Sequence, residues 1–331
     1  MLFELLEVPA ANAKNVHGGS QRENNSPDGT REIGEKFAIA SPAMPIRVFI
    51  DGAVRLPEEA KVSVLDRGFL YGDSVYETIG TLYGRLFAAR DHLDRLERSA
   101  RRIALRVPPR AEIEAAIKET VAAAGNPETR VRVILTRGVG KLDLDPASCD
   151  DCRLVVIAFP LGPPTPEMFA KGVAVTIVSI TRNSPQAIDP AVKSGNYLNN
   201  VLALGEARRK NGAYEAILCA GDGSIAEGST SNVFAVVRGE VWTPQPEVGI
   251  LDGITRAKVM DLARGAGIKL IERRIQPDEL RGADEAFITS ATRGVLPVTT
   301  IDGQPVATGV PGPITKQLMA LYDELARRGV E

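Results

Sequence analysis

One lysine in a turn is the residue of this sequence whose setting best suits covalent chemistry. Lys193 stands in a stretch rich in serine, glycine and asparagine, and Tyr197 follows four residues later. A helical periodicity of apolar residues that begins at Leu198 then predicts a long helix. A lysine held in such a turn can point inward, where desolvation favours the neutral amine that attacks an aldehyde to form an imine. By itself the signal is weak, because most lysines are solvated surface charges.

Further segments carry polar groups that could serve the same chemistry. Glu227 lies between a strand end and a glycine turn, where its carboxylate could pair with a protonated ring nitrogen. A glycine-containing turn presents the amides of Ile254 and Thr255, with the Thr255 hydroxyl, as an anion site at a helix start. Thr292 follows a strand and is another candidate phosphate ligand, and Arg90 precedes an amphipathic helix, where its guanidinium could hold a phosphate dianion. The alternative for each segment is an ordinary solvated turn or helix cap.

The composition is that of a soluble globular protein with room for two domains. The 331 residues are 44% hydrophobic and 25% charged. Forty basic and 42 acidic residues give a net charge of −2, which indicates neither a nucleic-acid partner nor an anionic membrane partner. No apolar run approaches the roughly 20 residues of a membrane span, and the first residues lack a basic n-region. We therefore expect a cytoplasmic protein.

Cysteines and histidines are few, which limits metal and redox chemistry. Cys149 and Cys152 form a C-x-x-C pair, Cys219 stands apart, and the histidines are His17 and His92. A four-ligand zinc site cannot be assembled from these residues, so we expect no metal. The two aspartates inside the C-x-x-C pair disfavour its thiolates. An incidental loop pair is therefore favoured over a redox-responsive one.

The chain divides by composition into a tail and two larger parts. Residues 1–45 are rich in asparagine, glycine, serine and charge, and are expected to be a flexible tail. An N-terminal domain is predicted over 46–160, and the proline cluster that begins at Pro160 opens an interdomain linker at 161–172. The C-terminal domain then covers 173–331. Strands outnumber helices and no βαβ alternation is evident, so the predicted class is α+β.

Periodicity predicts the individual elements within these parts. Hairpin turns are expected at Asp51-Gly52 and near Gly84. The predicted helices are Asp91–Arg106, Ala111–Ala124, one from Leu198, one from Asp252 to Gly265, and Ile314–Arg328. The predicted strands include Val131–Thr136, Leu154–Phe159, Val173–Ser179, Glu215–Cys219, Asn232–Val237, Lys269–Arg273 and Glu285–Thr289.

Six segments, in this order, resemble the class IV aminotransferases, which are the fold-type IV pyridoxal-phosphate enzymes. The segments are DRGFLYGDSVYETI, LFAARDHLDRL, VKSGNYLNN, IAEGSTSNVF, GILDGITR and ITSATRGVLPV. The resemblance runs from about Ile46 to about Leu325. It implies a smaller N-terminal and a larger C-terminal α+β domain, pyridoxal 5'-phosphate as cofactor, and a homodimer with the active site between the domains and near the subunit interface.

The resemblance also implies roles for single residues. Lys193 would be the Schiff-base lysine and the proton carrier, Glu227 would contact the pyridine nitrogen, and Tyr197 would donate to the phenolic oxygen of the cofactor. The phosphate cup, and the side chain that packs on the ring, would be supplied by Arg90, Ile254, Thr255 and Thr292, and by Leu251. The implied reaction is a ping-pong transfer of an amino group from an amino acid to an oxo acid such as 2-oxoglutarate or pyruvate.

The substrate side is less specific. Arg132 aligns with an arginine that branched-chain enzymes use near the distal carboxylate of glutamate, whereas Arg130 replaces an expected tyrosine. Tyr71, Tyr76 and Thr78 take pocket-wall positions, and the Arg-x-His pair of D-amino acid transaminases is absent. Plain solvation at a strand edge is the alternative for the two arginines. A branched-chain or hydrophobic L-amino acid is favoured as donor.

Several alternatives remain on the same scaffold. They are a D-amino acid or (R)-amine transaminase, an aminodeoxychorismate lyase and a cofactor-binding protein without enzymatic activity.

Overall fold

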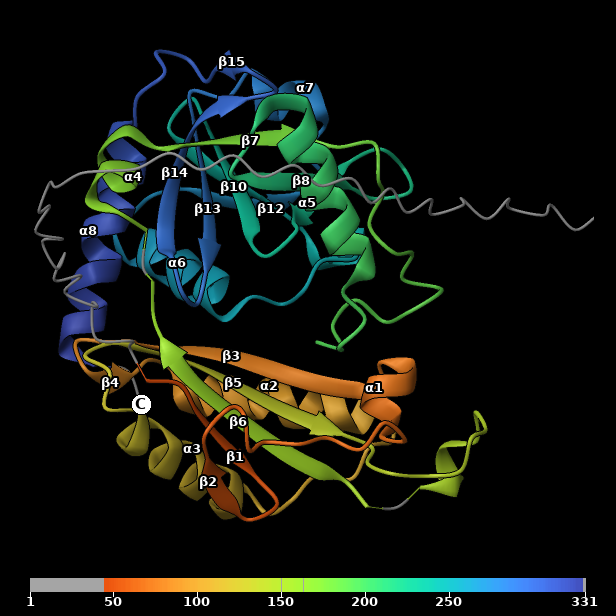
Figure 1. Cartoon of the computed structure of the whole chain (residues 1–331). Helices are drawn as coiled ribbons and strands as arrows, with labels where there is room; N and C mark the ends of the chain where they lie inside the picture. The colour runs from red at the N-terminus through yellow and green to blue at the C-terminus, as the bar shows by residue number, and fades with distance from the viewer. Residues whose placement is uncertain (1–44, 150, 163, 330–331) are drawn as a thin grey trace, which may run out of the picture. The chain divides into compact units, whose positions relative to one another are not determined.

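The computed structural model describes residues 45–149, 151–162 and 164–329, which form two β-sheets flanked by helices (Figure 1). All but the last residue of the predicted tail, 1–45, lies outside the described residues. The first sheet has six strands in the order β2-β1-β6-β5-β3-β4. The second has nine, in the order β12-β11-β10-β13-β14-β7-β8-β9, with β15 paired to β14. The predicted α+β fold is confirmed. No helix in the described part is both long and apolar enough to cross a membrane.

Every strand pair of the first sheet is antiparallel. Its strands are β1 (Arg47–Ile50), β2 (Ala53–Arg55), β3 (Ser74–Leu82), β4 (Arg85–Leu86), β5 (Thr129–Thr136) and β6 (Arg153–Pro160). Its helices are α1 (Arg67–Tyr71), α2 (Ala89–Arg102) and α3 (Arg110–Ala124), with a short 3₁₀ helix at Pro146–Ser148.

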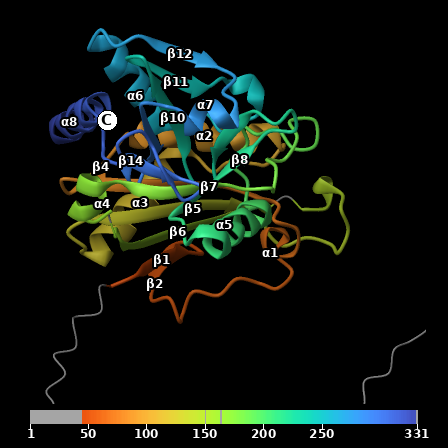
Figure 2. The same cartoon turned by 90° about the horizontal axis from the view of Figure 1, so that it is seen from above.

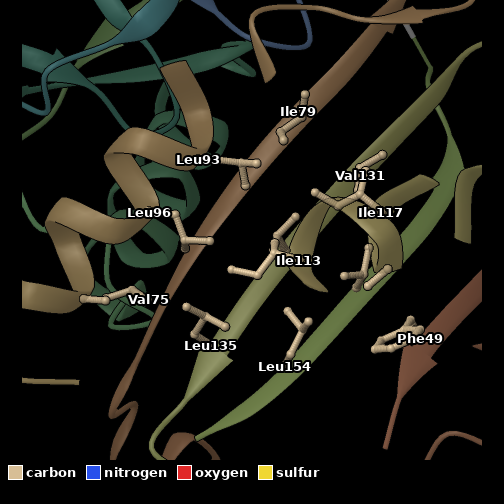
Figure 3. Close-up of a cluster of buried hydrophobic side chains, with 14 of the residues drawn as sticks. Phe49, Val75, Ile79, Leu93, Leu96, Ile113, Ile117, Val131, Leu135 and Leu154 are labelled. Carbon is tan, nitrogen blue, oxygen red and sulfur yellow. The ribbon is translucent and has the colours of Figure 1, made fainter. Parts of the chain in front are cut away.

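Alternation along β5 decides which of its side chains enter the core. Val131 and Leu135 are fully buried, and Figure 3 shows them with Leu96 of α2 and Ile113 of α3 in one hydrophobic cluster. Because successive strand residues point to opposite faces, Arg130 and Arg132 share the other face of the sheet. On β5, the face away from α2 and α3 therefore carries these two arginines.

The second sheet contains both parallel and antiparallel pairs. Its strands are β7 (Val173–Ile177), β8 (Glu215–Cys219), β9 (Ile225–Gly228), β10 (Asn232–Val237), β11 (Glu240–Pro244), β12 (Leu270–Arg273), β13 (Glu285–Ser290), β14 (Gly294–Ile301) and β15 (Gln304–Pro305). Its helices are α4 (Pro166–Lys171), α5 (Leu198–Asn211), α6 (Ile254–Gly265), α7 (Pro277–Arg281) and α8 (Pro313–Arg328), with a 3₁₀ helix at Pro246–Val248. Helices α6 and α8 pack together against β13 and β14 (Figure 1 and Figure 2).

The expectation that no βαβ unit is present is wrong at two places. Strands β7 and β8 pair in parallel with α5 between them along the chain, and β11 and β12 pair in parallel across α6. Neither unit has a clear strand–helix–strand pattern in the sequence. About twenty irregular residues separate β7 from α5, and β11 is a short strand that ends in a proline.

Candidate active site

A cavity of about 510 Å³ is lined by residues from both sheets and from the loops between them. It gathers every predicted site residue except Arg90 and Tyr71. Those in its wall are Tyr76, Thr78, Arg130, Arg132, Lys193, Tyr197, Glu227, Leu251, Ile254, Thr255 and Thr292. Residues more than 200 positions apart in the chain therefore face one space.

Lys193 is held by its backbone and extends its amine into this cavity. Its carbonyl accepts from the Tyr76 amide at 2.9 Å, and its own amide donates to Ser99 Oγ at 3.2 Å. Its Nζ lies 3.4 Å from the Tyr197 hydroxyl and 4.6 Å from the centroid of the Tyr76 ring. Burial, together with the neighbouring Tyr197, raises the pKa of Tyr76, which therefore stays a neutral phenol beside the amine.

Glu227 is buried on β9 with both carboxylate oxygens engaged. The Leu251 amide donates to Oε2 at 2.9 Å, and Arg182 Nε lies 2.7 Å from Oε1. Asn232 Nδ2 donates to the Leu251 carbonyl at 3.0 Å, which fixes the same segment from its other side. These contacts hold the carboxylate in one orientation at the cavity wall.

The first turn of α6 offers a built anion site. Gly253 is the N-cap residue and supplies no side-chain cap, so the first amides of α6 lack the partner that a capping side chain would give. A Cβ at Gly253 would collide with Asn232 Oδ1, which explains a glycine at this position. Thr255 is 3% exposed and lies in the cavity wall with Ile254 and Thr292. Amides, hydroxyls and the helix dipole there favour a phosphate.

The structure places Arg95, not the predicted Arg90, at this anion site. Arg90 is exposed on the first turn of α2, whereas Arg95 is 5% exposed on the face of α2 that packs inward. Arg95 donates to both carboxylate oxygens of Glu77, at 2.7 and 2.8 Å, and from Nη1 to the Asp252 carbonyl at 2.7 Å. A guanidinium has five N–H donors, so two remain, one on each Nη, beside the start of α6.

Glu77 and His92 complete a buried charged cluster that the sequence analysis missed. His92 Nδ1 lies 2.7 Å from Glu77 Oε2. Although burial alone raises the pKa of Glu77, Arg95 and His92 lower it well below its ordinary value. Burial lowers the pKa of His92, so the neutral imidazole donates from Nδ1 to the ionised carboxylate. The sequence contains one signal for this cluster. His92 and Arg95 have the helical spacing that places them on the apolar face of α2 with Leu93 and Leu96, where polar side chains need buried partners.

A second missed network lies under the Ser-Thr-Ser run that follows Glu227. Glu215 is 1% exposed and accepts hydrogen bonds from Ser229, from Thr230 at 2.8 Å and from Arg293 Nη1 at 2.8 Å. Arg293 also donates to the Thr230 carbonyl at 2.8 Å. The cluster ties the turn after β9 to the residue that follows Thr292.

Tyr71 also lies outside the cavity. It is on α1, 37% exposed, with the Arg67 guanidinium 5.2 Å from its ring. Tyr76 and Thr78 do reach the wall, on the same face of β3, and Thr78 is directly opposite Arg132 in the ladder. The predicted substrate side is therefore assembled from β3 and β5 without Tyr71.

Comparison with known proteins agrees with this geometry. The family model "Amino-transferase class IV" matches residues 74–301. The chain is 36% identical over 281 residues to a "Putative branched-chain-amino-acid aminotransferase" of Methanocaldococcus jannaschii, covering 85% of this chain and 96% of the relative. It is 34% identical to a D-alanine aminotransferase of Bacillus licheniformis, covering 82% and 94%.

A solved structure shows the same fold. The branched-chain amino acid aminotransferase of T.th., solved with pyridoxamine 5'-phosphate, has a TM-score of 0.80 and 33% identity, covering 85% of this chain and 93% of that one. A lysine amine, a buried carboxylate and a phosphate cradle in one cavity define an enzyme that activates amines through a phosphorylated aldehyde. The chain belongs to the class IV aminotransferases and is an enzyme that uses pyridoxal phosphate.

The cavity fits that cofactor at three separate points. The uncapped start of α6 and the spare donors of Arg95 suit a phosphate dianion. The Glu227 carboxylate suits a protonated ring nitrogen, and the Lys193 amine suits an aldehyde carbon. Together these groups suit a phosphorylated aromatic aldehyde better than a metal ion.

Proposed function

We propose that this enzyme transfers the amino group of a branched-chain or other hydrophobic L-amino acid to an oxo acid such as 2-oxoglutarate or pyruvate. The observation that carries the proposal is Arg132, whose guanidinium lies 3.7 Å from the centroid of the Tyr76 ring in the wall beside Lys193. There it can take the distal carboxylate of 2-oxoglutarate, while the cavity lining also includes the apolar residues Ile188, Val192 and Leu204, which suit a hydrophobic donor. The T.th. enzyme, 32% identical, has been solved with N-(5'-phosphopyridoxyl)-L-glutamate, which supports an L-configured substrate.

Some residues of the cavity would bind the cofactor, and others would transfer the proton. When bound, pyridoxal phosphate supplies an aldehyde that takes the substrate nitrogen and a ring that accepts electrons from the α-carbon. Arg95, the amides of Ile254 and Thr255, and Thr292 would hold the phosphate. Glu227 would keep the ring nitrogen protonated.

Lys193 would move the proton at the substrate α-carbon, because its amine is the basic group that extends into the cavity from a fixed backbone. The Tyr197 hydroxyl, 3.4 Å from this amine, would orient it and donate to the phenolic oxygen.

We also propose that the enzyme is a homodimer, because it exposes large apolar side chains on neighbouring segments. Phe69 of α1, Leu142 and Leu144 of the loop after β5, and Leu198 and Val201 of α5 are each 62–76% exposed. In Figure 1 and Figure 2 these segments lie toward the same side of the molecule. Exposed apolar side chains grouped in this way are typical of a protein–protein interface, and a second copy of the chain would cover them. Light scattering after size exclusion would measure the mass directly.

The function is tested by a half-reaction screen that follows the cofactor absorbance. L-leucine is expected to shift the spectrum fastest, and D-leucine, D-alanine and (R)-phenylethylamine more slowly. Lys193→Ala is expected to abolish turnover, whereas the exposed Lys171→Ala serves as a matched control and keeps it. Appreciable turnover by Lys193→Ala would refute the assignment of the lysine.

A D-amino acid transaminase is the second candidate, favoured by the Bacillus licheniformis relative and by Thr78 in place of the glycine usual in branched-chain enzymes. Faster reaction with D-alanine than with L-leucine would select it. Release of pyruvate from aminodeoxychorismate without an amino acceptor would instead select the lyase.

A further inference from the structure

The arginines of the cavity wall differ in how their charge is balanced. Arg95, Arg182 and Arg293 each pair with a buried carboxylate, namely Glu77, Glu227 and Glu215. Arg208 is exposed and donates to the Tyr214 carbonyl. Within the described part of the chain, the half-buried Arg130 and Arg132 have no carboxylate partner. These two bring uncompensated positive charge to the cavity.

Arg130 is held by an aromatic ring rather than by an anion. Its guanidinium carbon lies 4.5 Å from the centroid of the Phe159 ring, and these two residues are direct partners in the β5–β6 ladder. Its Nε is buried and has no hydrogen-bond partner among the residues that the structure describes. A guanidinium stacked on a ring has a fixed plane and free N–H edges, which is the geometry that a planar carboxylate matches.

Two other arginines lie close enough to Arg130 to affect its charge. Burial lowers the pKa of Arg130, and the charges of Arg293 and Arg132 lower it further. On β3, Gly80 is its partner, and a Cβ at Gly80 would lie 3.0 Å from the Ala291 carbonyl. The loop that carries Thr292 and Arg293 therefore rests beside Arg130.

Arg132 lies two residues along the same strand face and belongs to a different part of the wall. It is opposite Thr78 and stacks on Tyr76, about 7 Å of strand away from Arg130. The two guanidiniums can thus serve two separate carboxylates. A hydrophobic amino acid has one carboxylate and a dicarboxylic acceptor has two, but all of these substrates share the one on the α-carbon.

We propose that Arg130 binds the α-carboxylate that amino-acid donors and oxo-acid acceptors have in common, and so selects amino acids over simple amines. The assignment rests on the proposed transaminase function. It leaves Arg132 for the second carboxylate of a dicarboxylic acceptor. Arg130 is thereby a substrate-binding residue that sets specificity, since an amine without a carboxylate would leave its charge unpaired in the cavity.

The test compares substrates with no, one and two carboxylates in the holoenzyme. Half-reaction rate constants are measured for 3-methylbutylamine, L-leucine and L-glutamate with wild type, Arg130→Met and the exposed control Arg101→Met. Arg130→Met is expected to slow L-leucine and L-glutamate by the same factor, about 10- to 100-fold, as for the loss of a charge-assisted hydrogen bond. The rate constant for 3-methylbutylamine is expected to change less than about threefold.

A binding measurement gives a readout that does not depend on turnover. Titration calorimetry of the holoenzyme with 4-methylpentanoate, an unreactive carboxylate, is expected to show at least about tenfold weaker binding to Arg130→Met than to wild type or Arg101→Met. Unchanged binding would overturn the proposal, and an unchanged melting temperature of Arg130→Met shows that the variant is folded.

Two kinetic outcomes would also overturn the proposal. An equal loss with 3-methylbutylamine and L-leucine would show that Arg130 does not recognise the carboxylate. A loss confined to L-glutamate would assign Arg130 to the second carboxylate instead. If wild type reacts with D-leucine and not with L-leucine, the proposed donor is wrong, but the same comparison made with D-leucine still decides the role of Arg130.

Discussion

Replacing Glu77 by glutamine is expected to destabilise the apoenzyme by about 3–5 kcal/mol. The carboxylate is completely buried and accepts from Arg95 Nε at 2.7 Å, Arg95 Nη2 at 2.8 Å and His92 Nδ1 at 2.7 Å. Glutamine keeps the shape but leaves the Arg95 charge unpaired, and breaking a buried ion pair in this way costs about that amount. It is a large share of the roughly 5–15 kcal/mol that stabilises a typical domain.

The same variant is expected to bind pyridoxal phosphate more weakly. Glu77 fixes the plane of the Arg95 guanidinium, whose two spare N–H donors lie beside the start of α6. A loosened guanidinium forms the phosphate hydrogen bonds at a higher entropic cost. We expect the dissociation constant of the cofactor to rise by about tenfold or more, measured by fluorescence titration of the apoenzyme.

Thermal unfolding of the apoenzyme tests the stability loss. A fall in melting temperature of roughly 4–7 °C is expected for Glu77→Gln, and almost none for the exposed control Glu119→Gln. The double variant Glu77→Met/Arg95→Met is expected to recover most of the stability, because it removes both charges, but not the cofactor affinity. A loss below about 1 kcal/mol in the single variant would refute the reasoning.

The pH dependence of the unfolding free energy is an independent test of the same ion pair. The pKa of Glu77 is lowered in the folded protein, so near and below about pH 4.3 the unfolded state binds more protons. The stabilisation is complete above that pH and is lost as the pH falls toward the folded pKa. Wild type should therefore lose more stability than Glu77→Gln between pH 6 and pH 3 in denaturant titrations.

Three further predictions concern other parts of the molecule. Arg132→Ala should raise the KM for 2-oxoglutarate more than that for 4-methyl-2-oxopentanoate in steady-state assays, and equal effects would remove Arg132 from the substrate side. Burial raises the pKa of Cys152 to about 12, so mass spectrometry should find it almost unlabelled by iodoacetamide at pH 8, and fast labelling would contradict this. Gly253→Ala would displace Asn232 and should cost about 1–3 kcal/mol in thermal unfolding, so an unchanged melting temperature would show that the collision is relieved.

Local sequence patterns predicted the class of chemistry and most of the helices and strands. Lys193, Glu227 and Thr255 stand in segments whose turns and glycines are encoded within a few residues, so the motifs could be read without the fold. Period-2 and period-3.6 patterns likewise placed most of the strands and helices, including α2 and β5. These signals are local, because backbone propensity and amphipathicity act over single turns and strands.

Which side chains meet in the site depends on packing between distant parts of the chain. Arg90 and Arg95 stand in one motif, but only the rotation of α2 against β3 turns Arg95 toward Glu77 and the start of α6. The parallel pairing of β7 with β8, the contact of Glu215 with Arg293 and the proximity of Arg130 to Arg293 join residues 40 or more positions apart. Such pairings depend on how whole sheets and loops pack, and a single sequence carries no periodic trace of that packing.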